Sequence, residues 1–388
     1  MRILHTSDWH IGRTFHGHST LTAVTTVLSA IADLVRERHV DVVIAAGDVF
    51  DSATPSGDAF DLLQKALLGL REAGATVVLT SGNHDSPARL GFAAPFARLA
   101  GVVIATDPDG VGVPIPLEDE HGPVDFYAIP YLEPALLRHR WPDEQFRNQA
   151  DAMRFAMGRV RASATERRRA GARSVAVAHT FAAGGEAASA DSERPIVVGT
   201  VDVVPLSVFD GVDYVALGHI HGRATLAEGI RYSGAILHYS FGEAGKPRGG
   251  WLVDLDADGV ASVEWVDVPV PRPLAVLTGE LDALLGSAEF APYEDHWVSA
   301  ILTDTRRPLE AMRKLQTRFP WCANVEHRPA AVVDDGRTSY AERVQGKTDP
   351  EILEAFLAHV RGGDGPSPEE AELFAAVLTE QGAKAVTA

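Results

Sequence analysis

The sequence has a single cysteine, Cys322, among its 388 residues, and this excludes two kinds of site. One cysteine cannot form an internal disulfide, and it cannot supply the several thiolates of a zinc cluster. We interpret Cys322 as a buried thiol of apolar character, which is the usual state of a free cysteine. Such cysteine usage fits a reducing compartment, so we expect a cytoplasmic protein.

Long apolar runs are also absent. No stretch approaches the roughly 18 apolar residues that span a bilayer, and the N-terminus has no charged-then-apolar leader pattern. Apolar residues make up 46% of the chain and charged residues 23%, which is ordinary for globular proteins. At roughly 100–200 residues per domain, the length predicts two or three domains.

Positive charge is scarce. Lys and Arg number 35 against 53 Asp and Glu, so the formal net charge is −18. A surface this acidic argues against broad, sequence-blind coating of nucleic acid. A local basic track, or metal ions that contact a phosphate directly, remains compatible with this composition.

Short apolar runs alternate with helical patterns through the first two-thirds of the chain. The runs are rich in branched residues and nearly continuous, which is typical of strands buried on both faces. They end at Leu4 or cover residues 42–45, 77–79, 126–129, 175–178 and 214–217. Helical patterns cover residues 21–38 and 59–72, and a long polar one runs from about 143 to 169. This alternation predicts an α/β fold, with a sheet covered by helices.

A proline-rich stretch at residues 268–273 predicts a linker between domains. We expect a first domain over residues 1–268, a small α/β domain over 274–345 and a helical tail over 349–388. The small domain should hold strands at 297–302, at Val325 and at 330–333, and a helix at 308–319. Two tail helices should begin near Asp349 and Ser367, each with one apolar stripe.

Asp, His and Asn side chains follow five of the six apolar runs. Because ligands of open α/β sheets bind beyond the carboxyl ends of strands, we expect these side chains to share one rim. Oxygen and imidazole ligands without sulfur suit Mn, Fe or Zn better than Ca or Mg. Seven candidates are too many for one tetrahedral ion but are enough for two ions that share a carboxylate and hold a phosphate. The candidates are Asp8, His10, Asp48, Asn83, His179, His219 and His221.

The motifs that carry these seven residues occur in a fixed order along the chain, and His84 and Asp85 follow Asn83 directly. Together they resemble the motifs of the calcineurin-type metallophosphoesterase superfamily. Their flanks resemble more closely the SbcD family, the nuclease subunits of bacterial SbcCD exonucleases. These flanks are residues 5–13, 46–51, 81–87, 191–193, 217–221, 232–234 and 240–243. The resemblance is specific over about residues 1–250. After that it is limited to the overall length, a small capping domain and a helical tail. It departs at Ala235-Ile236, where Ser-Pro is expected, and this concerns the shape of a loop rather than the metal ligands.

The resemblance implies a four-layer αββα sandwich with a small α/β capping domain and a C-terminal helical tail. It implies two manganese ions, with Mg, Fe or Zn as substitutes. One ion would bind Asp8, His10, Asp48 and His221, and the other Asp48, Asn83, His179 and His219. His84 would stabilise or protonate the leaving oxygen of the phosphate, and Asp85 would orient His84.

The implied function is that of a manganese-dependent DNA nuclease acting with an SbcC-type ATPase in DNA end processing, repair, recombination and replication. It would be an exonuclease on duplex ends and an endonuclease on single strands or hairpins. The tail helices would bind the ATPase, and helices near residues 59–70 and 88–99 would form a homodimer within a heterotetramer. Two alternatives stay open: a stand-alone phosphoesterase on small phosphodiesters or phosphoproteins, and a catalytically silent scaffold that bridges DNA ends or partners.

DNA binding would require local cations for phosphate contacts. Arg13, near His16 and His18, follows the first metal motif and is one candidate, although a solvated loop explains it equally well. Five further candidates gather in the small domain, where an exposed helix face is the alternative explanation. They are Arg306, Arg307, Arg313, Lys314 and Arg318.

Overall fold

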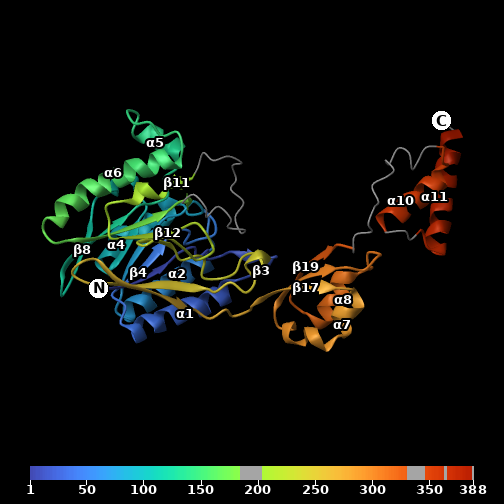
Figure 1. The fold of residues 1–388 in the computed structure, drawn as a ribbon, viewed down its shortest axis with the longest axis horizontal. Coiled ribbons are helices and arrows are strands. Elements are labelled where there is room, and N and C mark those ends of the chain that lie inside the picture. The colour runs from blue at the N-terminus through green and yellow to red at the C-terminus, as the bar shows by residue number, and fades with distance from the viewer. Residues whose placement is uncertain (184–202, 330–345, 362–364, 387–388) are drawn as a thin grey trace. The chain divides into compact units, whose positions relative to one another are not determined.

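The computed structural model describes residues 1–183, 203–329, 346–361 and 365–386. The chain divides into two compact units, Met1–Pro273 and Leu274–Ala388 (Figure 1). The division falls at the end of the proline-rich stretch.

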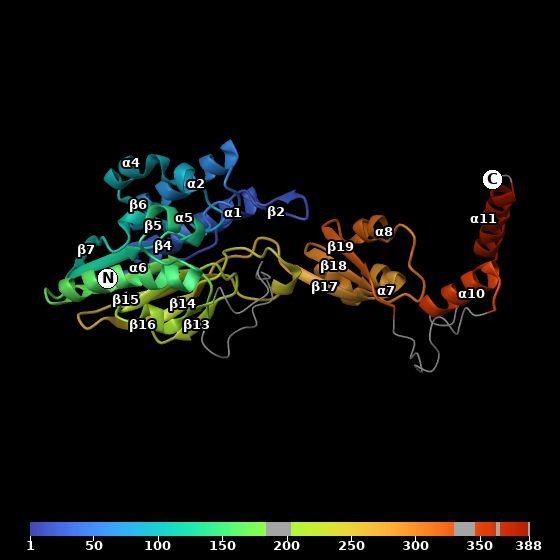
Figure 2. The same cartoon turned by 90° about the horizontal axis from the view of Figure 1, so that it is seen from above.

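Two six-stranded sheets form the centre of the first unit (Figures 1 and 2). In the first sheet the strand order is β16-β15-β1-β4-β5-β6. Strands β1, β4, β5 and β6 run parallel, whereas β15 and β16 are antiparallel additions at one side. The strands are β1 (Arg2–Thr6), β4 (Val42–Ala46), β5 (Thr76–Thr80), β6 (Val102–Ala105), β15 (Gly249–Leu255) and β16 (Val260–Asp267).

The second sheet has the strand order β13-β14-β12-β9-β8-β7. Its four inner strands β14, β12, β9 and β8 are parallel, and the outer strands β13 and β7 are antiparallel to their neighbours. The strands are β7 (Ile115–Asp119), β8 (Gly122–Ala128), β9 (Arg173–His179), β12 (Tyr214–Gly218), β13 (Ala224–Ala227) and β14 (Ile230–Tyr232). The apolar runs of the sequence are therefore strands, but they belong to two sheets and not to one.

The two sheets pack face to face and are covered by helices outside, which gives four layers. Ile44 and Val78 of the first sheet and Phe126 and Val177 of the second share a fully buried cluster between the sheets. Because side chains alternate along a strand, each sheet has a second apolar face, and helices cover it. Figure 1 shows α1 and α6 on opposite sides of the paired sheets. The fold is thus the α/β metallophosphoesterase sandwich that the sequence motifs implied.

The helices begin where capping residues place them. On the first sheet lie α1 (Leu21–Arg38), α2 (Gly57–Glu72), α3 (Pro87–Leu90) and α4 (Ala94–Leu99), and on the second α5 (Pro134–Arg140) and α6 (Gln149–Arg168). Helix α1 has the predicted bounds. Helix α6 begins at Gln149, six residues after the predicted start, because the side chain of Asn148 accepts the N–H of Asp151 and caps it there.

Several short elements complete the first unit. They are β2 (Thr14–Phe15), β3 (His18–Ser19), β10 (Ala182–Ala183), β11 (Val204–Pro205), η1 (Gly91–Ala93), η2 (Pro108–Gly110), η3 (Leu206–Phe209) and η4 (Phe241–Glu243). Strands β2 and β3 form a small hairpin just after the loop of Asp8 and His10.

The second unit contains a three-stranded parallel sheet of order β17-β18-β19. Its elements are β17 (Leu274–Gly279), α7 (Leu281–Gly286), η5 (Ala288–Tyr293), β18 (Trp297–Leu302), α8 (Ala311–Arg318) and β19 (Cys322–His327). Cys322 is buried in the core of this sheet, as expected. Helix α8 begins three residues after the predicted Pro308 because Glu310 has a left-handed backbone, φ 53°, which a helix cannot continue through. The strand predicted at 330–333 lies outside the described residues.

Two helices, α10 (Asp349–Val360) and α11 (Pro368–Val386), form the tail and contact each other. Thr348 and Glu351 make a capping box at the start of α10. Arg361 donates two 2.8 Å hydrogen bonds to the carboxylate of Glu370, which links the two helices. None of the described helices is both long and apolar enough to span a membrane.

Candidate metal centre

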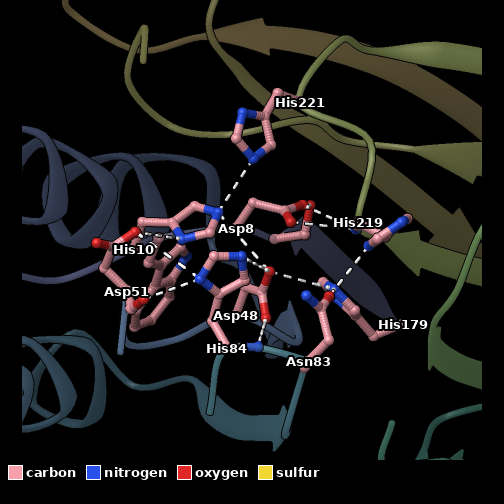
Figure 3. A network of polar contacts seen from close by, with 12 residues as sticks. Asp8, His10, Asp48, Asp51, Asn83, His84, His179, His219 and His221 are labelled. Atoms are coloured by element: carbon pink, nitrogen blue, oxygen red, sulfur yellow. Dashed lines mark hydrogen bonds and ion pairs between the residues drawn. The ribbon is translucent and has the colours of Figure 1, made fainter. Parts of the chain in front are cut away.

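The loops that follow β1, β4, β5, β9 and β12 meet at one end of the paired sheets, and Figure 3 shows their polar side chains directed toward one another. The first two loops are joined by their backbones: the N–H of Asp8 donates to the carbonyl of Gly47 at 3.1 Å and that of His10 to the carbonyl of Asp48 at 3.0 Å. The candidate residues thus come together, but at the adjoining ends of two sheets rather than on the rim of one.

Four of the candidate residues have a left-handed backbone, which is uncommon outside glycine. The φ angles are 52° at Asp8, 43° at His10, 48° at Asp48 and 105° at His219. Each such residue costs roughly 1–3 kcal/mol and persists only where the surrounding structure holds it, typically at functional sites. The concentration of these angles in three loops indicates that the loops are shaped for a site.

Glycines beside the candidate residues allow the loops to approach one another closely. Gly47 has φ 81°, and a Cβ there would lie 2.3 Å from Nδ1 of His179. A Cβ on Gly82 would lie 2.0 Å from a carboxylate oxygen of Asp48. Both contacts are shorter than any real Cβ makes, so the glycines are needed for packing of one loop on the next.

Asp8, His10 and His221 form what we call the first cluster. All three side chains are buried, with exposed fractions of 0–1%. Nε2 of His10 lies 3.0 Å from Nε2 of His221, and one atom from each residue lies within 4.8 Å of the others, close enough to share a cation. The carboxylate of Asp8 is fixed by the backbone N–H of His219, which lies 3.1 Å from Oδ1.

Asn83, His179 and His219 form what we call the second cluster. Oδ1 of Asn83 lies 3.0 Å from Nε2 of His179 and 3.1 Å from Nδ1 of His219. Nδ1 of His179 donates to the carbonyl oxygen of Ala46 at 2.9 Å, so Nε2 is the ring nitrogen that faces the cluster.

Asp48 lies between the two clusters. Its Oδ2 is 3.7 Å from Nε2 of His10 in the first cluster and 3.3 Å from Nε2 of His179 in the second. Its Oδ1 accepts the backbone N–H of His84 at 2.9 Å. The buried carboxylate of Asp48 therefore faces both clusters, which is the position of a bridging ligand between two ions, and Asp8 also lies close enough to Asp48 and His179 to share an ion with them.

The electrostatics of these groups fit divalent cations. Burial alone would lower the pKa of His179, but the neighbouring carboxylate of Asp48 raises this pKa to about 9. Burial would raise the pKa of Asp48, but His179 and His10 outweigh it and hold this pKa well below its usual range. Burial lowers the pKa of His10, which favours the neutral imidazole that metal ions bind. A cation between such nitrogens and carboxylates would satisfy all of them.

His84 lies beside Asp48 on the open side of the site. Nδ1 of His84 lies 2.8 Å from the carbonyl oxygen of Asp51, and Nε2 lies 4.0 Å from Oδ2 of Asp48. The imidazole is 31% exposed, and Asn83 and His219 beside it are also accessible. His84, Asn83 and His219 therefore form the accessible edge of the site, whereas the first cluster is buried.

Asp85 does not contact the ring of His84, which corrects the expected orienting role. Its carboxylate accepts three backbone N–H groups, from Gly82 at 2.9 Å, Val49 at 3.0 Å and Phe50 at 2.8 Å. Burial and the charge of Asp48 raise the pKa of Asp85 to about 6 despite these bonds. Asp85 thus ties the loop after β5 to the loop after β4, while the carbonyl of Asp51 orients His84.

Arg13 lies at the edge of the site. Its guanidinium is 3.5 Å from the carboxylate of Asp51 and stacks over the ring of Tyr239, 4.7 Å from the ring centroid. The side chain is only 25% exposed, so the environment of Arg13 is a structured rim rather than the solvated loop considered above.

The cations of the second unit differ in what they contact. The guanidinium of Arg318 bonds Glu294 and the carbonyl of Leu284, both at 2.9 Å, and so supports the unit itself. Arg313 pairs with Glu310, and Arg306 donates to the carbonyl of Gly365 at 3.3 Å. Arg307 and Lys314 are exposed.

Three residues that the sequence did not assign support the site. Asp51, three residues after Asp48, lies 3.3 Å from Nδ1 of His10 through its carboxylate. Glu243 and Arg248 are buried against His221. Asp51 and Glu243 lie within the SbcD-like flanks at residues 46–51 and 240–243, which was a usable signal, whereas Arg248 lies outside them.

The structure describes the loop at Ala235-Ile236 but not the motif at residues 191–193. Ala235 and Ile236, where the sequence departs from the expected pattern, are buried, and the N–H of Ala235 donates to the carbonyl of His221 at 3.1 Å. The loop therefore keeps its contact with the site despite the departure. The motif at residues 191–193 lies outside the described residues.

Comparison with known structures finds chains that are similar over most of their own length. TT1561 of Thermus thermophilus is 15% identical with a TM-score of 0.40, and the match covers 69% of this chain and 98% of that one. A dimetal phosphatase from Danio rerio is 14% identical with a TM-score of 0.41, over 69% of this chain and 99% of that one. Both TM-scores are low, so the family of this chain is assigned from its matches to protein-family models and not from these structures.

Two protein-family models match the chain. Residues 1–223 match the calcineurin-like phosphoesterase family, and these residues hold both clusters and Asp48. Residues 270–361 match the SbcD C-terminal model, described as the type 5 capsule protein repressor C-terminal domain. Because the first match covers more than half of the chain and the second lies C-terminal to it, the protein belongs to the calcineurin-like phosphoesterase family as an SbcD-like member with a buried His/Asp metal site.

Proposed function

We propose that the protein is a manganese-dependent DNA nuclease that acts with an SbcC-type ATPase in DNA end processing and repair. The observation that carries the proposal is the position of Asp48, whose Oδ2 faces His10 of the first cluster at 3.7 Å and His179 of the second at 3.3 Å. This arrangement is suited to two ions, and two-ion sites are well matched to in-line displacement at phosphorus.

The side chains divide into two ligand sets. One cation would be held by Asp8, His10, Asp48 and His221, and the other by Asp48, Asn83, His179 and His219. When bound, the two cations would neutralise the charge of the phosphate and lower the pKa of the attacking water. The buried ligands keep their donor atoms in place, because their ring nitrogens and loop backbones are tied to one another.

His84 would act on the leaving group. Its Nδ1 donates to the carbonyl of Asp51, and this contact fixes the ring with Nε2 toward the open side of Asp48. A protonated Nε2 would donate to the leaving oxygen as the phosphodiester bond breaks. His10, Asp48 and His84 are close enough to share an ion, and we assign His84 to the substrate because its side chain is 31% exposed, whereas His10 and Asp48 are buried.

DNA is the proposed substrate because of the second unit and the rim of the site. The match of residues 270–361 to an SbcD C-terminal model supports a nuclease subunit over a stand-alone phosphoesterase. Arg13 at the rim, and the exposed Arg307 and Lys314 of the second unit, are the cations that remain best placed for phosphate contacts.

Partner and self-association surfaces follow from exposed apolar side chains. On the tail helices Phe356, Val360, Leu373 and Val377 are about half exposed, which supports docking of the ATPase partner there.

On η1 and α4, Phe92, Phe96 and Leu99 are more than three-quarters exposed, which supports a homodimer formed through this face.

A nuclease assay with defined DNA tests the proposal. Blunt duplex and hairpin DNA are incubated with the protein and Mn²⁺, with and without an SbcC-type ATPase, and Asp48→Asn is the inactive control. We expect cleavage of both substrates by the wild-type protein with its partner and none by the control. Hydrolysis of bis-p-nitrophenyl phosphate without any DNA cleavage would favour the stand-alone phosphoesterase, and bound metal without any hydrolysis would favour the silent scaffold.

A further inference from the structure

A buried pair of opposite charges lies directly behind His221. Glu243 and Arg248 are 1% and 2% exposed, and the guanidinium of Arg248 bonds the carboxylate of Glu243. Oε1 of Glu243 lies 3.5 Å from Nδ1 of His221, and Arg248 also donates to the carbonyl of His221 at 2.5 Å. The pair therefore contacts His221 at both its ring and its backbone.

Stability alone is a weak reason for such a pair. Removing two charges from water is costly, and apolar residues of similar volume usually serve as well or better. Oε2 of Glu243 faces Arg248 and accepts the N–H of Tyr239 at 3.1 Å, while Oε1 is buried without a hydrogen bond and lies 3.5 Å from Nδ1 of His221. The carboxylate is thus held in one orientation, with one oxygen reserved for the imidazole.

The histidines of the two clusters differ in what supports them. In the first cluster, Nδ1 of His10 faces the carboxylate of Asp51 at 3.3 Å, and Nδ1 of His221 faces that of Glu243. In the second cluster, Nδ1 of His179 faces a neutral group, the carbonyl of Ala46. A carboxylate behind a metal-binding imidazole fixes its tautomer and raises its basicity more than a carbonyl does.

We propose that Glu243, held in place by Arg248, is a positioning residue that directs Nε2 of His221 toward His10 and Asp8 and so sets the affinity of the first metal position. The proposal rests on the two-cation site described above. A proton on Nδ1 of His221, shared with Glu243, leaves the lone pair of Nε2 directed at the cluster. Loss of such a support typically weakens metal binding by about 10–100-fold.

Titration with Mn²⁺ alone, followed by electron paramagnetic resonance and equilibrium dialysis, tests the proposal without any activity assay. We expect the wild-type protein to bind two Mn²⁺ per chain with the spectrum of a coupled pair. In Glu243→Gln one of the two should bind about 10–100-fold more weakly, and at limiting metal the spectrum should become that of isolated Mn²⁺. Glu264→Gln, at an exposed ion pair with Arg38, is the matched control and should behave as the wild type.

A second variant separates positioning from folding, because Glu243→Gln leaves the guanidinium of Arg248 buried without its partner. The double variant Glu243→Gln/Arg248→Met removes both charges, and its thermal unfolding is measured beside the titration. If the double variant folds and one Mn²⁺ still binds weakly, the positioning role is supported.

Two results overturn the inference, and a third refutes the site itself. Equal affinity of both Mn²⁺ in Glu243→Gln and the wild type would show that Glu243 does not position His221. Recovery of both affinities in the double variant would show that the pair acts only through folding. Failure of the wild-type protein to bind any Mn²⁺ would refute the proposed function itself.

Discussion

Replacing His84 with alanine separates catalysis from metal binding. His84 lies at the exposed edge of the site, 31% accessible beside the buried Asp48, and its Nδ1 is engaged by the carbonyl of Asp51. We therefore expect His84→Ala to keep both cations and to lose the proton donor for the leaving oxygen. General acid catalysis by a positioned imidazole contributes about 10²–10⁴-fold, so kcat should fall by that factor, or about 2.7–5.4 kcal/mol.

The assay pairs a rate with a metal count. Hydrolysis of bis-p-nitrophenyl phosphate and of a DNA hairpin is measured with saturating Mn²⁺, and bound manganese is counted by equilibrium dialysis on the same samples. His84→Gln keeps the bulk of the side chain without a titratable proton and should lose as much activity as the alanine variant. A parallel loss of manganese would show that His84 is a ligand, since His10, Asp48 and His84 are themselves close enough to share an ion. An unchanged rate would remove His84 from the mechanism.

Three other predictions concern different parts of the molecule. Asp48→Asn, chosen because asparagine tolerates the φ of 48° at this position, should weaken both cations rather than one, and dialysis against Mn²⁺ checks this. Deletion of residues 349–388 should leave Mn²⁺ binding intact but abolish co-purification with an SbcC-type ATPase, and unchanged co-purification would exclude the tail as the docking site. Asp119→Asn should lower the free energy of unfolding by about 3 kcal/mol, because it leaves Arg173 buried without the carboxylate that it bonds at 2.5 Å. Burial would raise the pKa of Asp119, but the bond to Arg173 holds this pKa below its usual range. The stabilisation by this pair is therefore present near pH 7 and is lost as the pH falls below about 4. Urea denaturation at pH 7 and pH 3 should therefore show a larger difference between variant and wild type at pH 7, and Asp33→Asn, at an exposed pair with Arg36, should show little at either pH.

The parts of the site that could be predicted from the sequence are those that follow strands directly. Asp8, Asp48 and Asn83 each come just after a nearly continuous apolar run, and parallel strands place such residues at one end of a sheet. The strands themselves were predictable for the same reason, because burial on both faces leaves an uninterrupted apolar pattern. That they form two sheets did not follow from the apolar runs, since the choice of neighbours in a sheet depends on crossovers between distant segments, and it was expected only from the family resemblance.

Supports that come from far along the chain were not predictable. Glu243 at the end of η4 and Arg248 just before β15 are charged residues, which ordinarily predict solvent exposure, and only the tertiary structure shows that they bury each other beside His221. The role expected for Asp85 failed for a related reason, because its position next to His84 in sequence does not bring it to the ring of His84. Arg318 likewise lies in a basic stretch of sequence, yet it bonds the carbonyl of Leu284 within its own unit.

The central claim is that one buried carboxylate, Asp48, serves two cations. Anomalous diffraction at the manganese edge from crystals grown with Mn²⁺ tests this most directly. The account predicts two anomalous peaks about 3.5–4 Å apart, one beside His10 and His221 and one beside His179, with the carboxylate of Asp48 between them. A single peak, or peaks on separate surfaces away from Asp48, would contradict it.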